Sequence, residues 1–524
     1  MRLRAAIACA GLLAGALLAL PGATAQAASV RFEAESSPAV CTGTIDSDWT
    51  GYSGTGFCNA TNAVGASAQF TVNAATAGTA TLKARFANGT TAARPATLTV
   101  NGGSATAVSF ESTGAWGTWT TKTLSVPVSS GSNTIRFSPT AAAGLPNIDY
   151  LDADTGAVTP PASTALYVAT NGIDSAAGTQ AAPTTLPSAI SRVAPGGTIY
   201  VRGGTYSYSS TVTVPVGSDG TSGARTTLSA YPGETPVLNF SAQSESSTNR
   251  GLQLNASYWH LYGLVVEHAG DNGIYVGGSN NVVERTVTRF NHDSGLQLGR
   301  IASTTPSSQW PSNNLIVSAE SHDNADSDGE DADGFAAKLT TGTGNVFRYD
   351  VSHNNIDDGW DLYTKTDTGA IGPVTIEYSL SYNNGTLSDG TVNSNGDRNG
   401  YKLGGDDIAV NHAVQHSIAY GNGHHGFTYN SNPGTMAISN NVGIDNAERN
   451  FSFDAGTSVF RTNTSCRFDV SGSNDKTVGN ADSSNQFWSG TNGSRCSAYA
   501  GALGWSFAAD GHLAVTFGGS VVTP

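Results

Sequence analysis

Charged residues are scarce in this chain of 524 residues: Asp, Glu, Lys and Arg together make up 12 %, and only six residues are lysines. Long surface helices need charged, Ala/Leu/Lys/Glu-rich faces, so the scarcity argues against a helix-rich fold. Glycine, by contrast, occurs 63 times. Many short strands joined by turns fit this composition, and we expect an all-β protein of more than one domain.

Basic residues are fewer than acidic ones, with 25 Lys and Arg against 40 Asp and Glu, a net charge of −15. Nucleic acids and anionic membrane surfaces attract basic proteins. We therefore expect neither nucleic acid nor a membrane as a partner, and we expect a monomer.

A long apolar run occurs only at the N-terminus. It is too short and too close to a cleavage site to span a membrane, and no later segment reaches spanning length. "AAIACAGLLAGALLALPG" follows Arg2 and Arg4 and precedes the small residues "ATAQAAS". This order is typical of a secretory signal peptide, cleaved near Ala25–Ala28. The sequence therefore predicts a signal peptide over residues 1–28 and a secreted, extracellular protein. Its removal leaves 23 basic and 40 acidic residues, a net charge of −17 (23 − 40).

Cysteine is also sparse. Cys9 would be removed with the signal peptide, which leaves four cysteines. None of the four has the spacing of a metal-ligand or redox motif, so in an exported protein we expect disulfides. Three pairings are possible. The economical one joins neighbours in the sequence, Cys41 with Cys58 and Cys466 with Cys496.

The stretch "DADTGAVTPPASTA" marks a change of texture, and we predict a linker over residues 153–165. Before it, alternating runs such as "SAQFTVNA", "ATLKARFA" and "NTIRFSP" lie between Gly/Asn turns. Evenly spaced short strands of this kind are typical of an antiparallel β-sandwich. We expect that fold for residues 29–152 and a second domain over residues 166–524.

The first domain resembles carbohydrate-binding modules of families 35 and 6 in "FEAES", "GYSGTGF", "GAWGTWTT" and "PNIDYL". In such modules, paired glutamates near the start and an aspartate near the end hold a structural calcium ion. The resemblance implies that Glu33, Glu35 and Asp149 have this role here.

The same resemblance places a sugar cleft at Tyr52, Trp116 and Asn147, with Arg94 facing a uronate carboxylate. An aromatic face and a planar amide suit a sugar, because they supply apolar contact and directed hydrogen bonds. The alternative is that Tyr52 and Trp116 belong to the core of the sandwich.

The second domain contains a repeat. A pattern x-G-Φ-x-Φ, with Φ apolar, recurs from "RGLQL" at 250 to "HGFTY" at 425 and ends in "NFSF" at 450, at spacings of 22, 22, 39, 25, 41, 26 and 24 residues. Such a period predicts a solenoid with insertions within 299–332 and 364–398. Turns such as "SHNN" and "SYNN" supply Asn amides that can stack coil upon coil. We expect a right-handed parallel β-helix; a propeller or sandwich with chance repeats is the alternative.

The register of the repeat brings charged residues together. Both Φ positions of a coil face the core, so the residue between them faces outward. Read along the chain, that position holds Gln253, Tyr275, Gln297, Ala336, Asp361, Lys402, Thr428 and Ser452. Because coils stack about 4.8 Å apart, Asp361 and Lys402 are expected to be neighbours.

Just before the repeat glycine, Asp333 and Asp358 lie on successive coils, with Asp357 beside them. Together with Asp361 they form a set of four carboxylates without His or Cys, which favours a hard cation and fits Ca²⁺. The nearby run Asp326, Asp328, Glu330 and Asp331 is either a source of further oxygens or a solvated loop.

A calcium ion beside an outward lysine suggests abstraction of a carbon-bound proton. If a uronate carboxylate completes the metal shell, the ion stabilises the anion formed when the C5 proton leaves. A neutral Lys402 takes that proton, and elimination of the O4 oxygen then cleaves the polysaccharide without water. Insertions on both sides of the patch would make a groove that suits a polymer.

At these residues the chain resembles the pectate lyases of polysaccharide lyase family 9, in "DADGFAAK", "NNIDDGWDLY" and "NGYKLGG". The resemblance implies pectate or polygalacturonate as substrate and an alkaline optimum. It also implies Asp333, Asp357, Asp358 and Asp361 as calcium ligands and Lys402 as the Brønsted base.

Other assignments remain open at this point. Lys338 and Lys365 also face outward by alternation and are placed to grip substrate carboxylates, and Lys338 is the alternative base. A β-helix polygalacturonase, which hydrolyses with clustered aspartates, is a second candidate, with "GGDDI" and "GNGHHGF" as its motifs. The third is a non-catalytic cell-wall-binding protein stapled by calcium.

Overall fold

The computed structural model describes residues 30–522 except 75–77, 130, 155–162, 394 and 470. The predicted signal peptide, 1–28, and most of the predicted linker, 153–165, lie outside the described residues. The chain divides into two compact units, Met1–Pro161 and Ala162–Pro524, so the division falls within 153–165. No helix in the described ranges is long and apolar enough to cross a membrane.

The first unit is an antiparallel β-sandwich, as the alternating runs predict. Its two sheets bury Phe70, Phe86, Phe110 and Phe137 between them. One sheet consists of β1 (Val30–Glu33), β3 (Gly43–Asp46), β4 (Phe57–Ala60), β6 (Gly78–Ala87), β9 (Thr120–Val128) and β11 (Asn147–Asp154). The other consists of β2 (Val40–Cys41), β5 (Ala68–Ala74), β7 (Arg94–Val100), β8 (Thr106–Phe110) and β10 (Gly131–Pro139).

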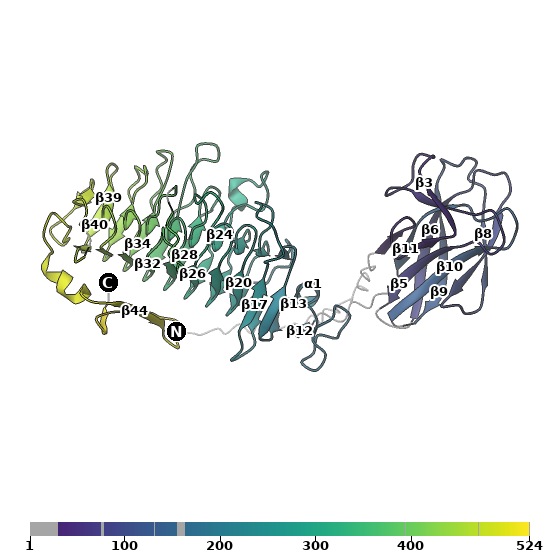
Figure 1. The fold of residues 1–524 in the computed structure, drawn as a ribbon, viewed down its shortest axis with the longest axis horizontal. Coiled ribbons are helices and arrows are strands. Elements are labelled where there is room, and N and C mark those ends of the chain that lie inside the picture. Colours follow the sequence, from purple (N-terminus) through teal and green to yellow (C-terminus); the bar gives the residue numbers. More distant parts are fainter. Residues whose placement is uncertain are drawn as a thin grey trace, which may run out of the picture. The chain divides into compact units, whose positions relative to one another are not determined.

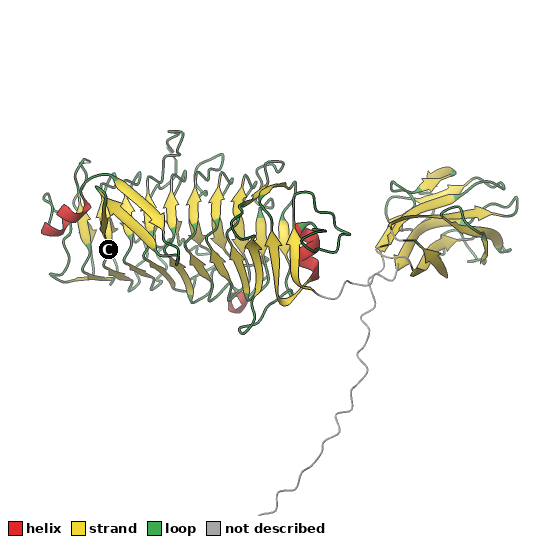
Figure 2. Cartoon of the chain, turned by 90° about the horizontal axis from the view of Figure 1, so that it is seen from below, coloured by secondary structure: helices red, strands yellow, loops and turns green. Residues whose placement is uncertain are grey.

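The second unit is a parallel β-helix in which each complete coil gives one strand to each of three sheets (Figures 1 and 2). Sheet 1 contains β12 (Ser163–Val168), β13 (Val193–Val201), β16 (Thr226–Ala230), β19 (Trp259–Tyr262), β22 (Val282–Glu284), β25 (Leu315–Val317), β28 (Asn345–Arg348), β31 (Val374–Glu377), β34 (Ala413–Gln415), β37 (Ala437–Ser439), β40 (Val459–Arg461) and β43 (Asn480–Ala481).

Sheet 2 contains β14 (Gly204–Ser207), β17 (Pro236–Asn239), β20 (Val265–Glu267), β23 (Val287–Arg289), β26 (Glu320–His322), β29 (Val351–His353), β32 (Leu380–Tyr382), β35 (Ile418–Tyr420), β38 (Val442–Ile444) and β41 (Thr464–Cys466). Sheet 3 contains β15 (Val212–Val214), β18 (Leu252–Leu254), β21 (Ile274–Val276), β24 (Leu296–Leu298), β27 (Phe335–Ala337), β30 (Trp360–Asp361), β33 (Tyr401–Lys402), β36 (Phe427–Thr428), β39 (Phe451–Phe453) and β42 (Lys476–Thr477).

Sheet 3 carries the repeat in the predicted register. Its Cα partners run from Gln253 through Tyr275, Gln297, Ala336, Asp361, Lys402 and Thr428 to Ser452, each residue on the next strand. The residues on either side of this column point inward and, apart from the half-buried Tyr429, are buried. The expected neighbourhood of Asp361 and Lys402 is therefore confirmed by direct strand pairing.

An aromatic stack fixes this register from inside. Phe335, Trp360, Tyr401, Phe427 and Phe451 occupy equivalent inward positions, and successive ring centroids lie 4.7–4.9 Å apart. All five are 0 % exposed. A slip of one residue would turn these rings to solvent, so packing and backbone pairing select the same register.

An asparagine ladder holds the bend between sheets 2 and 3. Asn291, Asn324, Asn355, Asn384 and Asn422 each donate a side-chain hydrogen bond to the asparagine of the next coil, at 2.7–3.0 Å. The stacked amides satisfy buried backbone N–H groups as well, since the Asn355 oxygen also accepts from the Asn324 N–H group. This is the stacking that the Asn-containing turns predict.

The ends and edges of the β-helix are covered by other elements. Helix α1 (Leu186–Arg192), capped by Thr185, buries Leu186, Ala189 and Ile190 at the first coils (Figure 2). Two 3₁₀ turns, η1 (Ser307–Gln309) and η2 (Ser494–Tyr499), lie in loops. The C-terminal sheet of β44 (Leu503–Phe507), β45 (Leu513–Phe517) and β46 (Ser520–Val522) packs against sheet 2.

Two disulfides close the loops expected from sequence proximity. Cys41 bonds to Cys58 in the sandwich, and Cys466 at the end of β41 bonds to Cys496 in η2. The pairing prediction is confirmed for both.

The ladder generates a stability prediction. Replacing Asn355 by Ala leaves Asn324 and Asn384 each one buried partner short, so we expect the free energy of unfolding to fall by about 1–3 kcal/mol. Denaturant unfolding measures it. The matched change Asn171→Ala, at an exposed turn, is expected to stay within about 0.5 kcal/mol of the unmodified protein. Equal effects of the two changes would show that the ladder adds no stability.

Candidate active site and metal centre

Three carboxylates meet where β27 and β30 begin. Asp333, Asp357 and Asp358 each offer an oxygen atom, and these atoms all lie within 4.8 Å of one another. The three side chains are 0–1 % exposed. They meet because the strands they precede are neighbours in sheet 3, so one coil brings its acidic bend directly over the next.

Backbone N–H groups of the loop before β33 hold two of these carboxylates. Asp357 Oδ1 accepts from the N–H groups of Asp397 and Arg398 at 2.6 and 3.1 Å. Asp358 Oδ1 accepts from Asn399 N–H at 2.6 Å. The end of the second insertion therefore fixes the orientation of Asp357 and Asp358 through backbone hydrogen bonds.

Two lysines border the cluster, and each of them also lies close to the carboxylate of Asp361. Lys338 Nζ lies 2.8 Å from Asp333 Oδ2 and 3.6 Å from Asp361 Oδ2. Lys402 Nζ lies 3.2 Å from Asp358 Oδ2 and 3.8 Å from Asp361 Oδ2. The two lysines are only 6 % and 8 % exposed. The amines thus compensate part of the negative charge.

The compensation is incomplete. Burial and the neighbouring carboxylates raise the pKa of Asp333 and of Asp357 well above the ordinary value. Burial likewise raises the pKa of Asp358 to about 7, although Lys402 acts in the opposite direction. Buried like charges oppose ionisation in this way unless a cation is bound between them.

These residues fit a hard divalent cation. The donors are carboxylate oxygens, and Asp358 Oδ2 is buried without a hydrogen-bond donor of good geometry. Oxygen donors on a flexible set of side chains suit Ca²⁺. Asp333, Asp357 and Asp358 would hold the ion. Asp361 lies beside this group, close to the amines of Lys338 and Lys402.

A cavity of about 250 Å³ opens beside the two amines, lined among others by Asp361, Tyr363, Lys365 and Lys402. Glu330 and Asp331 of the acidic run form its other wall. A cavity of this size, with convergent charged groups, is large enough for part of a sugar chain.

Two contacts of the site were not predicted from the sequence. Lys338, expected to face a substrate, lines this cavity and also pairs with Asp333 at 2.8 Å. Asp397, not singled out, forms an ion pair with Lys402 Nζ at 2.8 Å. Its only signal in the sequence was an acidic residue five positions before the lysine, at the end of an insertion.

In the sandwich, Glu33, Glu35 and Asp149 gather around the turn at Ser53. Asp149 accepts from the Ser53 N–H group at 3.0 and 3.1 Å, and Ser53 Oγ donates to Glu33 at 2.7 Å. Glu35 accepts from the Thr55 N–H group at 2.8 Å, and its second oxygen is buried without a partner. Arg85 forms an ion pair with Asp149. The three carboxylates thus share one turn.

Of the predicted sugar-cleft residues, Arg94 and Trp116 contact each other, whereas Tyr52 packs against a phenylalanine. The Arg94 guanidinium lies 5.0 Å from the centre of the Trp116 ring and donates to the Leu145 carbonyl at 2.6 Å. Tyr52 packs against Phe57 at 5.6 Å, and Asn147 is buried in β11. The partly exposed Trp116 is therefore backed by a fixed cation.

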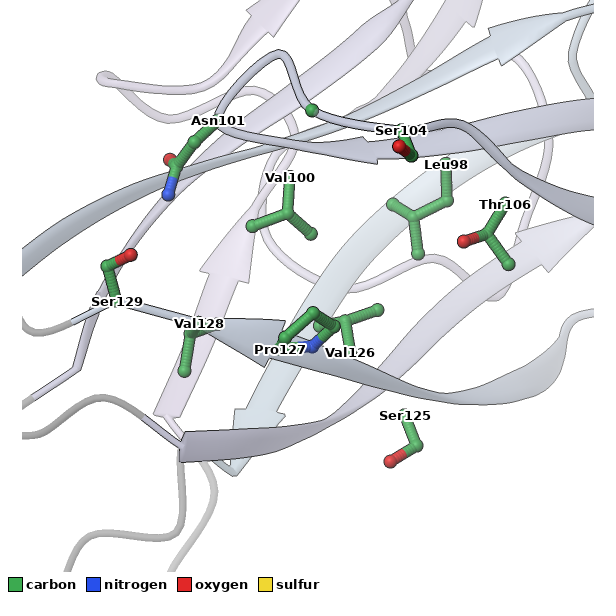
Figure 3. Close-up of a pocket in the computed structure, with 11 residues that line it drawn as sticks. Leu98, Val100, Asn101, Ser104, Thr106, Ser125, Val126, Pro127, Val128 and Ser129 are labelled. Atoms are coloured by element: carbon green, nitrogen blue, oxygen red, sulfur yellow. The ribbon is translucent and has the colours of Figure 1, made fainter.

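The sandwich has a hollow of about 540 Å³ between the β7–β8 turn and the end of β9 (Figure 3). Leu98, Val100, Val126 and Val128 line it together with small polar side chains, and none of its described lining residues is charged or aromatic. It offers no group for catalysis and no ring for sugar stacking.

Fold and site together define a parallel β-helix with an acidic, lysine-bearing centre on one sheet. A family model described as "Pel9A-like, right handed beta helix region" matches residues 166–465. The chain belongs to this Pel9A-like family and is a polysaccharide lyase. A second model, described as the CBM13 domain of alpha-galactosidase, matches residues 67–150, so the first unit is similar to a carbohydrate-binding module.

Relatives agree with this placement. Pectate lyase L of Paenibacillus polymyxa (strain SC2) is 55 % identical over 325 residues, 62 % of this chain and 72 % of that protein. Pectate lyase L of Thermoclostridium stercorarium is 44 % identical over 296 residues, 56 % of this chain and 23 % of that longer protein. The crystal structure of pectate lyase Pel9A matches with 31 % identity and a TM-score of 0.54, covering 64 % of this chain and 83 % of that one.

The buried carboxylates generate a second prediction. In Asp357→Asn the amide oxygen can still accept from the loop N–H groups, but one buried charge is gone. Because the folded-state pKa of Asp357 is raised above 3.8, its ionised form destabilises the fold above that pH. With chelator present, we expect Asp357→Asn to stabilise the protein at neutral pH, by about 1.4 kcal/mol per unit of raised pKa, and to change little below pH 3.8.

Thermal unfolding between acid and neutral pH measures this gain. The same variant is expected to lose most of the rise in melting temperature that added calcium gives the unmodified protein. Asp367→Asn, at an exposed position, serves as the control. A lower melting temperature for Asp357→Asn in chelator would contradict the like-charge account.

Proposed function

We propose that this protein is a secreted, calcium-dependent lyase that cleaves the α-1,4-galacturonan of pectate and polygalacturonate by β-elimination. The observation that carries the proposal is the strand pairing that sets Lys402 beside Asp361, with Asp358 3.2 Å from its amine and a sugar-sized cavity in front. The names of the relatives point to the same substrate.

The chain's own residues would act as follows. Asp333, Asp357 and Asp358 hold the divalent cation, with Asp361 beside them. When bound, calcium supplies a positive charge that engages the uronate carboxylate and stabilises the negative charge developing as the C5 proton leaves. Lys402 accepts that proton, the C4–O4 bond breaks as a double bond forms between C4 and C5, and the departing oxygen takes a proton from solvent.

Lys402 must be neutral to accept a proton. Burial disfavours its ammonium form, but Asp361, Asp358 and Asp397 outweigh burial and raise the pKa of Lys402 above its ordinary value. Neutralising these carboxylates removes what raises the pKa and leaves burial, which lowers it. The base is therefore expected to become active only in the charge-compensated site, and at alkaline pH.

The carbohydrate-binding module would keep the enzyme on its polymer. Trp116 supplies a ring face, and Arg94 beneath it supplies a positive charge suited to a uronate. The N-terminal apolar run supports export, which places both units where plant polysaccharides are found.

Removing the base tests the reaction. Lys402→Ala is expected to lower kcat on polygalacturonate by about 10²–10⁴-fold, the contribution of a positioned general base, while calcium still raises the melting temperature. Elimination leaves an unsaturated sugar, so ultraviolet absorbance of the product measures the rate. Lys476→Ala, in the same outward column of sheet 3, should retain full activity.

Chelator should abolish the absorbance signal of the unmodified enzyme, and added calcium should restore it. Chain cleavage with new reducing ends but no absorbance would indicate hydrolysis instead. Full elimination activity in Lys402→Ala, or in chelator, would overturn the proposed mechanism.

The module generates a separate prediction. Trp116→Ala is expected to weaken binding of the whole chain to insoluble pectate roughly tenfold, the equivalent of about 1.4 kcal/mol, without changing the rate on short soluble oligogalacturonates. Tyr150→Ala is the matched control, because Tyr150 also stacks with an arginine, Arg31 at 3.6 Å, outside the predicted cleft. Pull-down on insoluble pectate measures the binding of both variants. An equal loss of affinity in the two would contradict a role of Trp116 in sugar binding.

A further inference from the structure

A second group of metal-ligating side chains lies farther along sheet 3. His424, His425 and Glu448 each offer one ligand atom, and these atoms all lie within 4.8 Å of one another. His425 directly precedes the repeat glycine of β36, as Asp358 precedes that of β30. Because β36 follows β30 by two strands in the sheet, the group lies roughly 10 Å along the same edge from the carboxylates.

The contacts within the group are unequal. His424 Nε2 lies 2.9 Å from Glu448 Oε2, a bond between adjacent coils. The rings of His424 and His425 stack at 3.8 Å between centroids. His425 is only 9 % exposed, yet its Nδ1 atom is buried without a hydrogen-bond partner. A hydrogen-bonded His–Glu pair explains the first contact but leaves the buried nitrogen unexplained.

The side chains can move into a coordination sphere. Ligands of a tetrahedral ion with bonds of about 2.0–2.2 Å lie about 3.4 Å apart. That spacing falls between the 2.9 Å of the His424–Glu448 contact and the 4.8 Å within which all three ligand atoms lie. The side chains of His424 and Glu448 are 36 % and 39 % exposed, which leaves them room to rotate toward the fixed His425.

From this geometry we propose that His424, His425 and Glu448 form a site for a zinc-class divalent cation, separate from the calcium centre. Two imidazole nitrogens and one carboxylate are the donors that zinc prefers, whereas calcium takes oxygens only. Three protein ligands leave one position open, which a water or a carboxylate oxygen fills. The carboxylate cluster would thus select calcium, and the His–His–Glu cluster on the same sheet would select zinc.

Calorimetric titration of the calcium-depleted full chain with ZnCl₂ tests the proposal. We expect one zinc ion per chain and a higher melting temperature. His424→Gln and Glu448→Gln, both at partly exposed positions, should each weaken zinc binding by about tenfold or more. His425→Gln should do the same, and the two exposed variants keep the test valid if His425→Gln fails to fold.

Two matched variants locate the ion. His260→Gln removes another His–Glu pair that joins adjacent coils at 2.9 Å but belongs to no group of three metal-ligating side chains among the described residues, so zinc affinity should be unchanged. Asp358→Asn should lose calcium binding and keep zinc binding. Bound Co²⁺ should show the visible absorption of a nitrogen-ligated ion.

Three results would overturn the site: no zinc binding by the unmodified chain, unchanged affinity in His424→Gln and Glu448→Gln, or loss of zinc in Asp358→Asn. The last would mean that zinc occupies the carboxylates. Because these are binding measurements, they stand or fall independently of lyase activity.

Discussion

The stacking of one coil on the next is the interaction on which the rest of this structure depends. Backbone pairing sets a spacing close to about 4.8 Å, and the aromatic stack from Phe335 to Phe451 repeats it at 4.7–4.9 Å inside the core. Any residue at a fixed place in the repeat is thereby brought over its equivalents. The site is a consequence of this rule: Asp361 and Lys402 are neighbours because their coils are.

The same stacking concentrates charge where the fold can least tolerate it. Asp333, Asp357 and Asp358 are buried together, and an all-apolar edge would be more stable. Two lysines and the N–H groups of the loop before β33 offset part of the repulsion. In the proposed function, the remaining unfavourable charge would favour the binding of a divalent cation, and the bound cation would lower the pKa of the Lys402 amine.

The two proposed metal sites of sheet 3 share one architecture. Both use the bend immediately before the repeat glycine, where side chains of neighbouring coils converge. Substituting the residue at that bend changes the chemistry without changing the backbone: Asp at position 358 gives an oxygen donor, and His at position 425 gives a nitrogen donor. A solenoid can therefore place different sites at regular intervals along one edge.

The two-unit organisation, the β-helix, the register of sheet 3 and both disulfides could be predicted from the amino-acid sequence, because a strand alternates with period two and every coil repeats the last. The meeting of Asp333 with Asp358 needs nothing beyond that register. The contacts of the insertions and of the long side chains around the two sites are set by tertiary packing alone. Asp397 pairs with Lys402, Lys338 folds back onto Asp333, and His424 meets Glu448 across coils. Loops have no period and long side chains have many rotamers, so these contacts depend on packing that no local pattern records.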